Sequence, residues 1–519
     1  MLNKTFIDKE WSVMLSKMLS GAVNGIDGYT VQVEVDISSG FPCFEIVGLP
    51  GSAVKESKER VRTAIKNSGF VLPAKRITIN LAPADTKKEG PSFDLPIAVG
   101  VLASMNIIDH VNAGGYIMAG ELSLDGGIKG VNGILPIMYS AYKSGIKKCI
   151  VSEDNADEAA LVEGMEVYPA KSIQQLIKYF KGSIELKRHT VNIESLFNNM
   201  QSGSSPDFSD VKGQEYVKRA MEIAAAGYHN ILLCGHPGTG KTMLARRLPS
   251  ILPDLTFDES MEITKVYSVA GLLESGKSLI TSRPFRSPHH TVSAVALTGG
   301  SSVPKPGEIS LSHYGVLFLD ELPEFKRSVL EALRQPMEDG NVTIARVNST
   351  VTYPSKFMLV SAMNPCPCGY LGDSRCHCTT SEIAKYRKRI SGPLLDRIDI
   401  FAETPDVSYN ELSKKTKSES SAEIKNRVTA ARDIQLKRYN KDGIFFNSQM
   451  SPSQTEKYCV MDNDAAELIK SAFDSLRLSA RAYHKILKVA RTIADLDGSS
   501  EIRLEHAAEA LQYRNLTLP

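Results

Sequence analysis

A glycine-rich segment of eight residues is the strongest chemical feature of the sequence. It reads GHPGTGKT and comprises Gly235, His236, Pro237, Gly238, Thr239, Gly240, Lys241 and Thr242. An apolar run precedes it and a helix-compatible stretch follows, as a phosphate-binding loop requires. The glycines let backbone N–H groups converge on phosphate oxygens, Lys241 is expected to reach the β- and γ-phosphates, and Thr242 is expected to hold Mg²⁺. The alternative is a glycine-rich turn with a capping threonine.

Two acids and an amide follow further apolar runs that we expect to be buried strands. The run VLFLDE (316–321) ends in Asp320, expected to complete the Mg²⁺ shell, and Glu321, expected to polarise an attacking water. The alternative is a pair of surface carboxylates. Asn364 follows the run KFMLVSA (356–362) and is suited either to position that water or to form a turn. Arg397 lies in LLDRID, where periodicity does not separate a functional role from a surface ion pair.

Four cysteines are crowded into thirteen residues of the chain. They are Cys366, Cys368, Cys376 and Cys378, arranged as two C-x-C pairs. Thiolates at this density in a reducing cytosol predict a tetrahedral Zn²⁺ site, with a reactive or disulfide-forming set and unligated thiols as alternatives. A basic run with Lys385, Arg387, Lys388 and Arg389 follows, which is either a solvated face or a contact for nucleic-acid phosphates.

The composition is that of an ordinary globular protein. The chain has 519 residues, with 42% hydrophobic residues, 23% charged residues and a formal net charge of +2. Any surface for nucleic acid must therefore be local. We find no apolar run of about 18 residues and no secretory signal, so we expect a cytoplasmic protein with no membrane partner.

Composition and patterning divide the chain into four parts. We expect a mixed β-rich and helical domain over 1–180, a polar linker over 181–210, an α/β domain with a mostly parallel sheet over 211–406, and a helical domain over 407–519. Alternation of apolar and polar residues predicts strands over 29–38 and 75–82. Helical spacing predicts helices over 52–68, 481–496 and 505–513.

Several long motifs together resemble one known family. The segments GHPGTGKT, VLFLDELPEF, SAMNPCPCG, GPLLDRIDI and LSARAYHKILKVARTIADLDG are similar to those of the YifB/ComM family of magnesium-chelatase-like AAA+ ATPases. The resemblance covers nearly the whole chain. It implies a Lon-like α+β domain, a P-loop AAA+ domain with a parallel sheet, and a carboxy-terminal helical lid.

The resemblance also implies a role for each candidate residue. Lys241 and Thr242 match Walker A, and Asp320 and Glu321 match Walker B. Asn364 matches sensor 1, Arg397 matches an arginine finger supplied to the neighbouring subunit, and Arg481 matches sensor 2 on the lid. A finger acting in trans implies a ring, and such proteins are similar to hexameric motors.

Two segments of the expected motor remain open to interpretation. In 283–312, which resembles an insert facing a central pore, His289 and His290 lack other ligands at metal-binding spacing. A role in the pore or nucleotide pocket, or plain loop structure, is favoured over a metal pair. Residues 341–353 predict a β-hairpin that corresponds to a DNA-touching hairpin of related helicases. Arg346 near its tip is either a phosphate contact or a solvated charge.

The amino-terminal domain resembles the Lon peptidase fold, but it departs from the family at one position. Ser92 matches the nucleophilic serine, whereas the position of the catalytic lysine falls on Ile137. Since a serine needs a base to act as a nucleophile, we expect no peptidase activity. We expect Ser92 instead to cap the helix that follows.

The leading hypothesis is an ATP-driven ring that moves branch points on DNA during recombination of incoming DNA, as the resemblance implies. A metal-insertion motor like the magnesium-chelatase subunit is the first alternative, and an assembly that uses nucleotide only as a switch is the second.

Overall fold

The computed structural model describes residues 15–193, 195–196, 206–274, 276–300, 304–346, 349–407, 409 and 418–514, without the side chains of residues 346–349. The chain forms two compact units. One comprises residues 1–199 with 260–280, and the other comprises 200–259 with 281–519. Part of the predicted linker, 197–205, lies outside the described residues. The predicted 211–406 domain therefore contributes a segment to the amino-terminal unit.

The amino-terminal unit is built on a mixed seven-stranded sheet. In spatial order its strands are β3 (Cys43–Val47), β4 (Arg76–Ala82), β2 (Asp27–Ser38), β1 (Ser16–Asn24), β5 (Ile117–Ala119), β8 (Lys148–Ser152) and β9 (Glu166–Ala170). β1 and β4 pair antiparallel with β2, whereas β1, β5, β8 and β9 are parallel. β6 (Glu121–Leu122) and β7 (Ile128–Lys129) form a separate small hairpin.

Helices cover both faces of this sheet because alternate strand residues point to opposite sides. Thus Met118 and Ile150 belong to one core, and Ile117 and Val151 to the other. The helices of the unit are α1 (Ser52–Asn67), α2 (Asp94–Ser104), α3 (His110–Gly114), α4 (Ile134–Lys143), α5 (Ala156–Ala159) and α6 (Ile173–Phe180). α1, α2 and α6 contribute to the first core, and α4 and α5 to the second. The carboxy-terminal part of α10 (Phe257–Ala270) also belongs to this unit.

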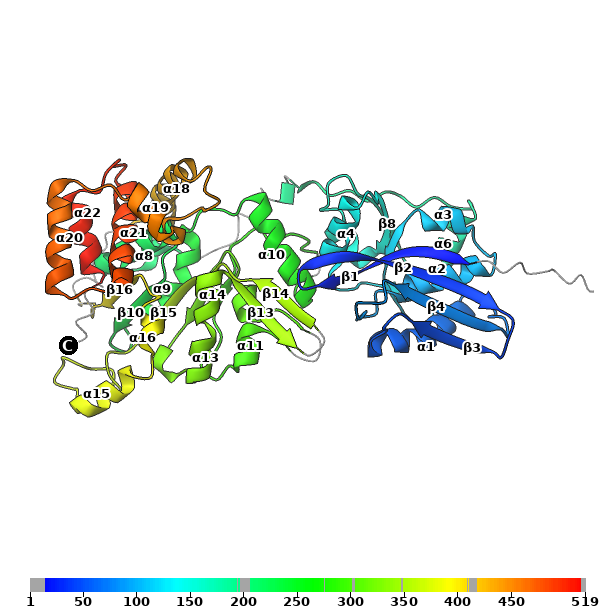
Figure 1. Cartoon of the computed structure of the whole chain (residues 1–519), viewed down its shortest axis with the longest axis horizontal. Helices are drawn as coiled ribbons and strands as arrows, with labels where there is room; N and C mark the ends of the chain where they lie inside the picture. Colours follow the sequence, from blue (N-terminus) through cyan, green and yellow to red (C-terminus); the bar gives the residue numbers. More distant parts are fainter. Residues whose placement is uncertain are drawn as a thin grey trace, which may run out of the picture. The chain divides into compact units, whose positions relative to one another are not determined.

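The second unit is built on a five-stranded parallel sheet. Its strands in spatial order are β11 (Phe285–Arg286), β12 (Val316–Leu319), β15 (Met358–Met363), β10 (Ile231–Gly235) and β16 (Ile400–Thr404). All neighbouring pairs are parallel, so the carboxyl ends of the strands share one edge. The predicted hairpin is present as β13 (Asn341–Arg346) and β14 (Ser349–Pro354), drawn in Figure 1. Its tip, 347–348, lies outside the described residues.

Helices precede and connect these strands, and further helices close the chain. The connecting helices are α8 (Glu215–Gly227), α9 (Lys241–Arg247), α11 (Ala294–Thr298), α12 (Glu308–Leu311), α13 (Arg327–Ala332), α14 (Arg334–Asp339), α15 (Thr380–Arg387) and α16 (Gly392–Leu395). The closing helices are α18 (Ser421–Arg438), α19 (Pro452–Tyr458), α20 (Asn463–Ser475), α21 (Ala480–Leu496) and α22 (Leu504–Gln512), coloured orange to red in Figure 1. α18 and α21 pack on α8, so this helical end shares a core with one face of the sheet.

The predicted fold class is confirmed, and so are the individual elements named from periodicity. The strands predicted over 29–38 and 75–82 are β2 and β4, and the helix predicted over 52–68 is α1. The closing helices predicted from 481 and 505 are α21 and α22, each within a residue of its predicted start. In the part of the chain that the structure describes, no helix is both long and apolar enough to cross a bilayer.

Candidate functional site

The glycine-rich segment lies where the chain leaves the central part of the parallel sheet. It connects β10 to α9, and Gly240 stands at the amino-terminal cap of α9 with φ +83°. This left-handed conformation favours glycine because a side chain would strain it. The Lys241 ammonium donates to the carbonyls of Gly235 and His236, each at 2.8 Å. Burial lowers the pKa of Lys241, although nearby groups that include Asp320 act in the opposite direction.

The threonine of this loop meets the acid at the end of β12. The Thr242 hydroxyl donates to Asp320 Oδ2 at 2.6 Å, although 78 residues separate them in the sequence. Hydroxyl and carboxylate oxygens are the ligands that Mg²⁺ prefers, so these two residues fit the predicted ion. Thr242 and Asp320 would hold a Mg²⁺ ion that enters with nucleotide, and such an ion would supply positive charge against the phosphates. The two side chains are already within hydrogen-bond distance of each other.

Glu321 adopts a left-handed backbone conformation with φ +51°. A non-glycine residue in this region is uncommon and is concentrated at functional sites. Its carboxylate is about half exposed and lies 3.5 Å from His290 Nδ1. The sequence left the role of His290 open, and the structure brings it to the predicted water-polarising acid. His290 follows β11, and Glu321 follows β12. These two strands are neighbours in the sheet, so strand order brings the two side chains together.

Asn364 follows β15, which lies between β10 and β12 in the sheet. Its Oδ1 accepts a hydrogen bond from Lys241 Nζ at 3.2 Å. The ends of three neighbouring parallel strands thus bring together Lys241, Asp320 and Asn364 at one edge. Ligands of open α/β sheets bind at this edge.

The two candidate arginines line a different part of the same unit. Arg397 and Arg481 both border a cavity of about 650 Å³, together with Glu338 and Lys485. Arg397 is paired with Glu338, and its guanidinium also donates to the Pro393 carbonyl at 2.6 Å. Among the contacts of the described residues, none joins either arginine to Lys241, Thr242, Asp320 or Glu321. The sequence offered no signal for Glu338, which lies 59 residues before Arg397.

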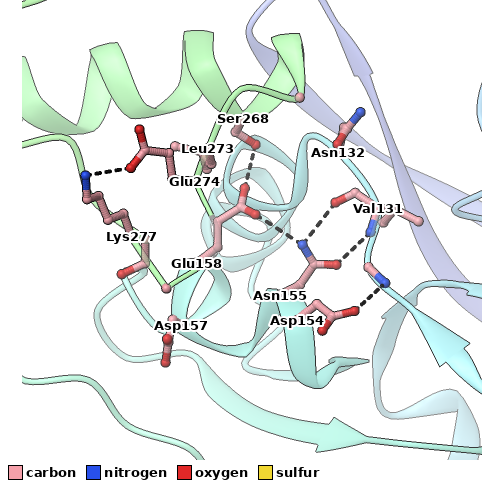
Figure 2. Close-up of a pocket in the computed structure, with 14 residues that line it drawn as sticks. Val131, Asn132, Asp154, Asn155, Asp157, Glu158, Ser268, Leu273, Glu274 and Lys277 are labelled. Carbon is pink, nitrogen blue, oxygen red and sulfur yellow. Dashed lines mark hydrogen bonds and ion pairs between the residues drawn. The ribbon is translucent and has the colours of Figure 1, made fainter.

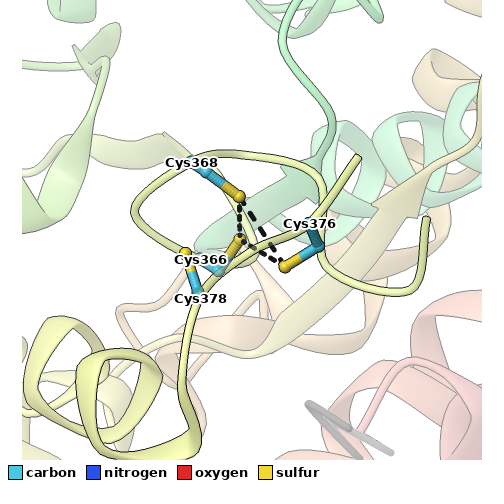
Figure 3. A group of neighbouring side chains, drawn as sticks. All are labelled: Cys366, Cys368, Cys376 and Cys378. Atoms are coloured by element: carbon cyan, nitrogen blue, oxygen red, sulfur yellow. Dashed lines mark hydrogen bonds between the residues drawn. The ribbon is translucent and has the colours of Figure 1, made fainter. Parts of the chain in front are cut away.

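The four clustered cysteines form a single group between β15 and α15 (Figure 3). Their sulfur atoms all lie within 4.8 Å of one another, with 3.3 Å between Cys366 and Cys368 and 3.7 Å between Cys368 and Cys376. Four sulfurs at about 2.3 Å from a tetrahedral Zn²⁺ are about 3.8 Å apart, so the group fits this ion. All eight cysteines of the chain are free thiols. The pKa of Cys368 is lowered to about 6, chiefly because the Tyr370 backbone donates a hydrogen bond to its sulfur.

The residues predicted to contact DNA have mixed surroundings. Lys385 and Lys388 are exposed. Arg389 forms an ion pair with both oxygens of Glu324, at 2.7 and 2.8 Å, which makes it a surface ion pair in this chain. Arg387 donates to the Pro365 carbonyl at 3.4 Å. The side chain of Arg346 lies outside the described part of the structure.

In the amino-terminal unit, the position of the Lon lysine is filled by a core residue. Ile137 is 2% exposed and packs against β1, where a Cβ on Gly21 would lie 2.3 Å from Ile137 Cγ2. The prediction that Ser92 caps the next helix is wrong. α2 begins after Phe93, and no side chain caps it. The Ser92 carbonyl instead accepts a hydrogen bond from Gly120 N, which ties this loop to the segment after β5.

These features define a class of protein. A phosphate-binding loop after β10, an acid pair after β12 and an asparagine after β15, on a five-stranded parallel sheet with a helical lid, are those of an AAA+ ATPase. Family models match three parts of the chain. They are described as "Subunit ChlI of Mg-chelatase" over 33–155, "Magnesium chelatase, subunit ChlI" over 207–412 and "Magnesium chelatase, subunit ChlI C-terminal" over 418–514.

The chain belongs to the YifB/ComM family of magnesium-chelatase-like AAA+ ATPases. It is 43% identical to competence protein ComM of Haemophilus influenzae, over 96% of this chain and 97% of that protein. It is 44% identical to protein YifB of Escherichia coli over the same shares of the two chains. It is also 31% identical to Lon protease 2 of Bacillus subtilis, over 24% of this chain and 22% of that protein. The Lon-like amino-terminal fold is consistent with this last similarity.

Proposed function

We propose that this protein is an ATP-hydrolysing ring motor that acts on DNA. The observation that carries the ATPase part is the convergence of Lys241, the Thr242–Asp320 pair and Asn364 at one edge of the parallel sheet. These groups bind and orient a nucleoside triphosphate with Mg²⁺. Glu321 then polarises the attacking water as a general base.

The position of the two arginines supports a shared active site between subunits. Arg397 and Arg481 line a cavity together and make no contact with the phosphate-binding residues within the described chain. In a ring Arg397 would instead reach the nucleotide of a neighbouring subunit, where its guanidinium stabilises charge on the γ-phosphate, while Arg481 is the candidate sensor 2 of the lid. We infer six subunits from the resemblance of the motor to hexameric relatives.

The DNA part of the proposal rests on similarity and on local charge. The near full-length relative from Haemophilus influenzae is named a competence protein, and competence is the uptake of DNA. The β13–β14 hairpin and the exposed Lys385 and Lys388 are the candidate contacts for phosphates. We expect branch migration or unwinding during recombination of incoming DNA.

Steady-state ATP turnover with and without forked or four-way DNA tests this function. We expect turnover that the branched DNA stimulates. Glu321→Gln should bind ATP but hydrolyse it at least about 100-fold more slowly, because only the water-polarising group is lost. Near wild-type hydrolysis by this variant would show that the Walker B assignment is wrong.

A metal-insertion motor is the second candidate, because the family models carry the name of a magnesium-chelatase subunit. ATP turnover that DNA leaves unchanged would favour this candidate. Nucleotide binding without turnover would instead favour an assembly that uses ATP only as a switch.

We also infer that the Lon-like domain does not cleave peptides. Ile137 cannot serve as a base for Ser92, because it is an apolar core residue that packs against β1. Ser92→Ala should therefore leave both ATP turnover and any background casein cleavage unchanged. A peptidase activity that disappears in Ser92→Ala would contradict this inference.

A further inference from the structure

The cysteine loop lies directly against the phosphate-binding loop. Gly369, which follows Cys368, has φ +89°. A Cβ at this position would lie 2.6 Å from Pro237 Cγ and 2.7 Å from Pro237 Cδ. Only a glycine permits so close an approach between these two segments.

His236, in the phosphate-binding loop, bonds both to the cysteine loop and to the chain after β16. Its Nδ1 lies 2.9 Å from Asp406 Oδ2, and its Nε2 lies 3.3 Å from the Leu371 carbonyl oxygen. The Tyr370 ring is also close, with 5.9 Å between the ring centroids. The phosphate-binding loop is therefore held by two segments, the chain after β16 at Asp406 and the cysteine loop at Leu371.

The cysteine loop contains no helix or strand from Pro365 to Cys378. Its contacts with Pro237 and His236 come from Gly369 and Leu371, which lie between the two C-x-C pairs. A Zn²⁺ ion bound by the four thiols in Figure 3 would close this stretch into a ring and fix those contacts.

We propose that the cysteine loop, closed by Zn²⁺, is a latch that holds the phosphate-binding loop in its nucleotide-binding shape. Zinc loading then sets the affinity for ATP. Asn364, two residues before Cys366, lies at the other end of the same loop and contacts Lys241. This inference rests on the proposed ATPase function and adds a regulation to that site.

Two glycines of the same loop provide a matched pair of variants. Gly369 and Gly372 both have φ +89°, but a Cβ at Gly372 would meet no atom within 4 Å. Gly369→Ala and Gly372→Ala therefore both place an alanine at the same left-handed φ, and only the first puts a Cβ against Pro237. Both variants retain all four thiols.

We would measure zinc content per chain and the Kd for a fluorescent ADP in the full-length protein. Both glycine variants should hold one zinc per chain. Gly369→Ala should bind the nucleotide about tenfold more weakly than Gly372→Ala, because the displaced Pro237 shifts the loop. Equal affinity of the two variants would overturn the latch.

Metal removal tests the role of zinc itself. Chelation of the wild-type protein should weaken ADP binding, and added Zn²⁺ should restore it. Cys378→Ser should lose zinc and bind ADP weakly, with no restoration, whereas Cys43→Ser, outside the cluster, should behave like wild type. A wild-type protein that holds no zinc, or whose ADP affinity is the same with and without zinc, would overturn the proposal.

Lys241→Ala separates this inference from the proposed function. That variant should keep its zinc and lose nucleotide binding, because it lacks the phosphate contact. If wild type binds ADP through Lys241 but Gly369→Ala has no effect, only the latch fails. If wild type binds no nucleotide, the ATPase proposal fails and the latch fails with it.

Discussion

At the scale of single residues, Glu321 and His290 form the least expected contact of the candidate site. Glu321 is held in a left-handed backbone conformation, which costs about 1 kcal/mol or more for a residue with a side chain. Such strain persists only where the surroundings determine the conformation. Its carboxylate lies 3.5 Å from His290 Nδ1, and the His290 ring packs against that of His289, with 4.0 Å between centroids.

We predict that His290 positions the Glu321 carboxylate so that it can polarise the attacking water. His290→Ala should lower kcat for ATP about tenfold and leave KM nearly unchanged, since His290 contacts the acid and not the phosphate-binding loop. His290→Asn, which retains a hydrogen-bonding group, should recover part of the rate. Steady-state kinetics of the variants provides the measurement.

His289→Ala is the comparison variant and should lose less rate than His290→Ala, because His289 bonds to Thr291 rather than to Glu321 and affects His290 only through ring packing. In a Glu321→Gln background, His290→Ala should cause no further loss of rate, since the two residues act together. Two results would contradict this prediction: an equal loss of rate in both histidine variants, or a further loss when His290→Ala is added to Glu321→Gln. Either would show that His290 only maintains the structure of its loop.

At the scale of elements, the segment 260–280, which includes most of α10, belongs to the amino-terminal unit although the sequence on both sides of it belongs to the second unit. Within the amino-terminal unit, the buried Ser268 hydroxyl donates to Glu158 (Figure 2). The Ser268 carbonyl also accepts from Gly133 N at 3.2 Å. Glu158 also accepts from Leu135 N at 2.8 Å, at the start of α4. Lys265 lies 3.9 Å above the Tyr139 ring centroid. These contacts tie the segment 260–280 to the helix that carries Ile137.

We predict that Ser268→Ala loosens this segment by about 1–3 kcal/mol, the usual cost of losing a hydrogen-bond partner of a buried polar group. Burial raises the pKa of Glu158, and the bond from Ser268 acts in the opposite direction. For a carboxyl group, the unfolded pKa is about 4.3. When the folded pKa is higher, the contribution of the group to folding stability falls as the pH rises from the unfolded pKa to the folded pKa. Since the variant raises the folded pKa further, its effect should be larger at pH 8 than at pH 5.

Hydrogen exchange of the amides in α4 and α5, read by mass spectrometry of the full chain, measures this local stability. Ser471→Ala, at an exposed position of α20, serves as the control and should change exchange little. If hydrogen-exchange protection of α4 and α5 is unchanged in Ser268→Ala at both pH values, the Ser268 hydroxyl contributes nothing to the stability of this region.

At the scale of the whole molecule, the question is whether one chain holds a complete active site. Lys241, Asp320 and Asn364 meet at the sheet edge, while Arg397 and Arg481 line a cavity with Glu338. A head-to-tail ring would bring Arg397 of one subunit to the nucleotide of the next. An arginine finger contributes roughly 10³ to 10⁵ in rate at comparable sites.

We predict that Lys241→Ala and Arg397→Ala are each inactive alone and regain partial ATP turnover when mixed. Activity should return only where the intact Lys241 of one chain meets the intact Arg397 of the other, which is about one interface in four at equal mixing. Turnover of mixed rings, with mixing verified by native mass spectrometry, is the measurement. No recovery in verified mixed rings would assign Arg397 to its own chain, where it pairs with Glu338.

Local patterns determined which elements form and which residues are able to do chemistry. The alternation in β2, the helical spacing in α21 and the GHPGTGKT segment each depend on neighbours in the sequence, so they are visible without a structure. The departure at Ile137 became visible through the resemblance to the Lon peptidase fold, in which one apolar residue of this chain stands where a base is needed. The capping role of Ser92 was wrong because a helix start depends on backbone geometry that the serine alone does not fix.

Tertiary structure alone decided which distant residues meet. Parallel strands place their carboxyl ends at one edge, so strand order, which the sequence does not encode locally, brings Asn364 to Lys241 and His290 to Glu321. The pairing of Arg397 with Glu338 and the contact of Gly369 with Pro237 likewise join segments far apart in the chain. The packing of 260–280 on α4 was also hidden, because burial of Ser268 beside Glu158 depends on long-range folding rather than on sequence periodicity.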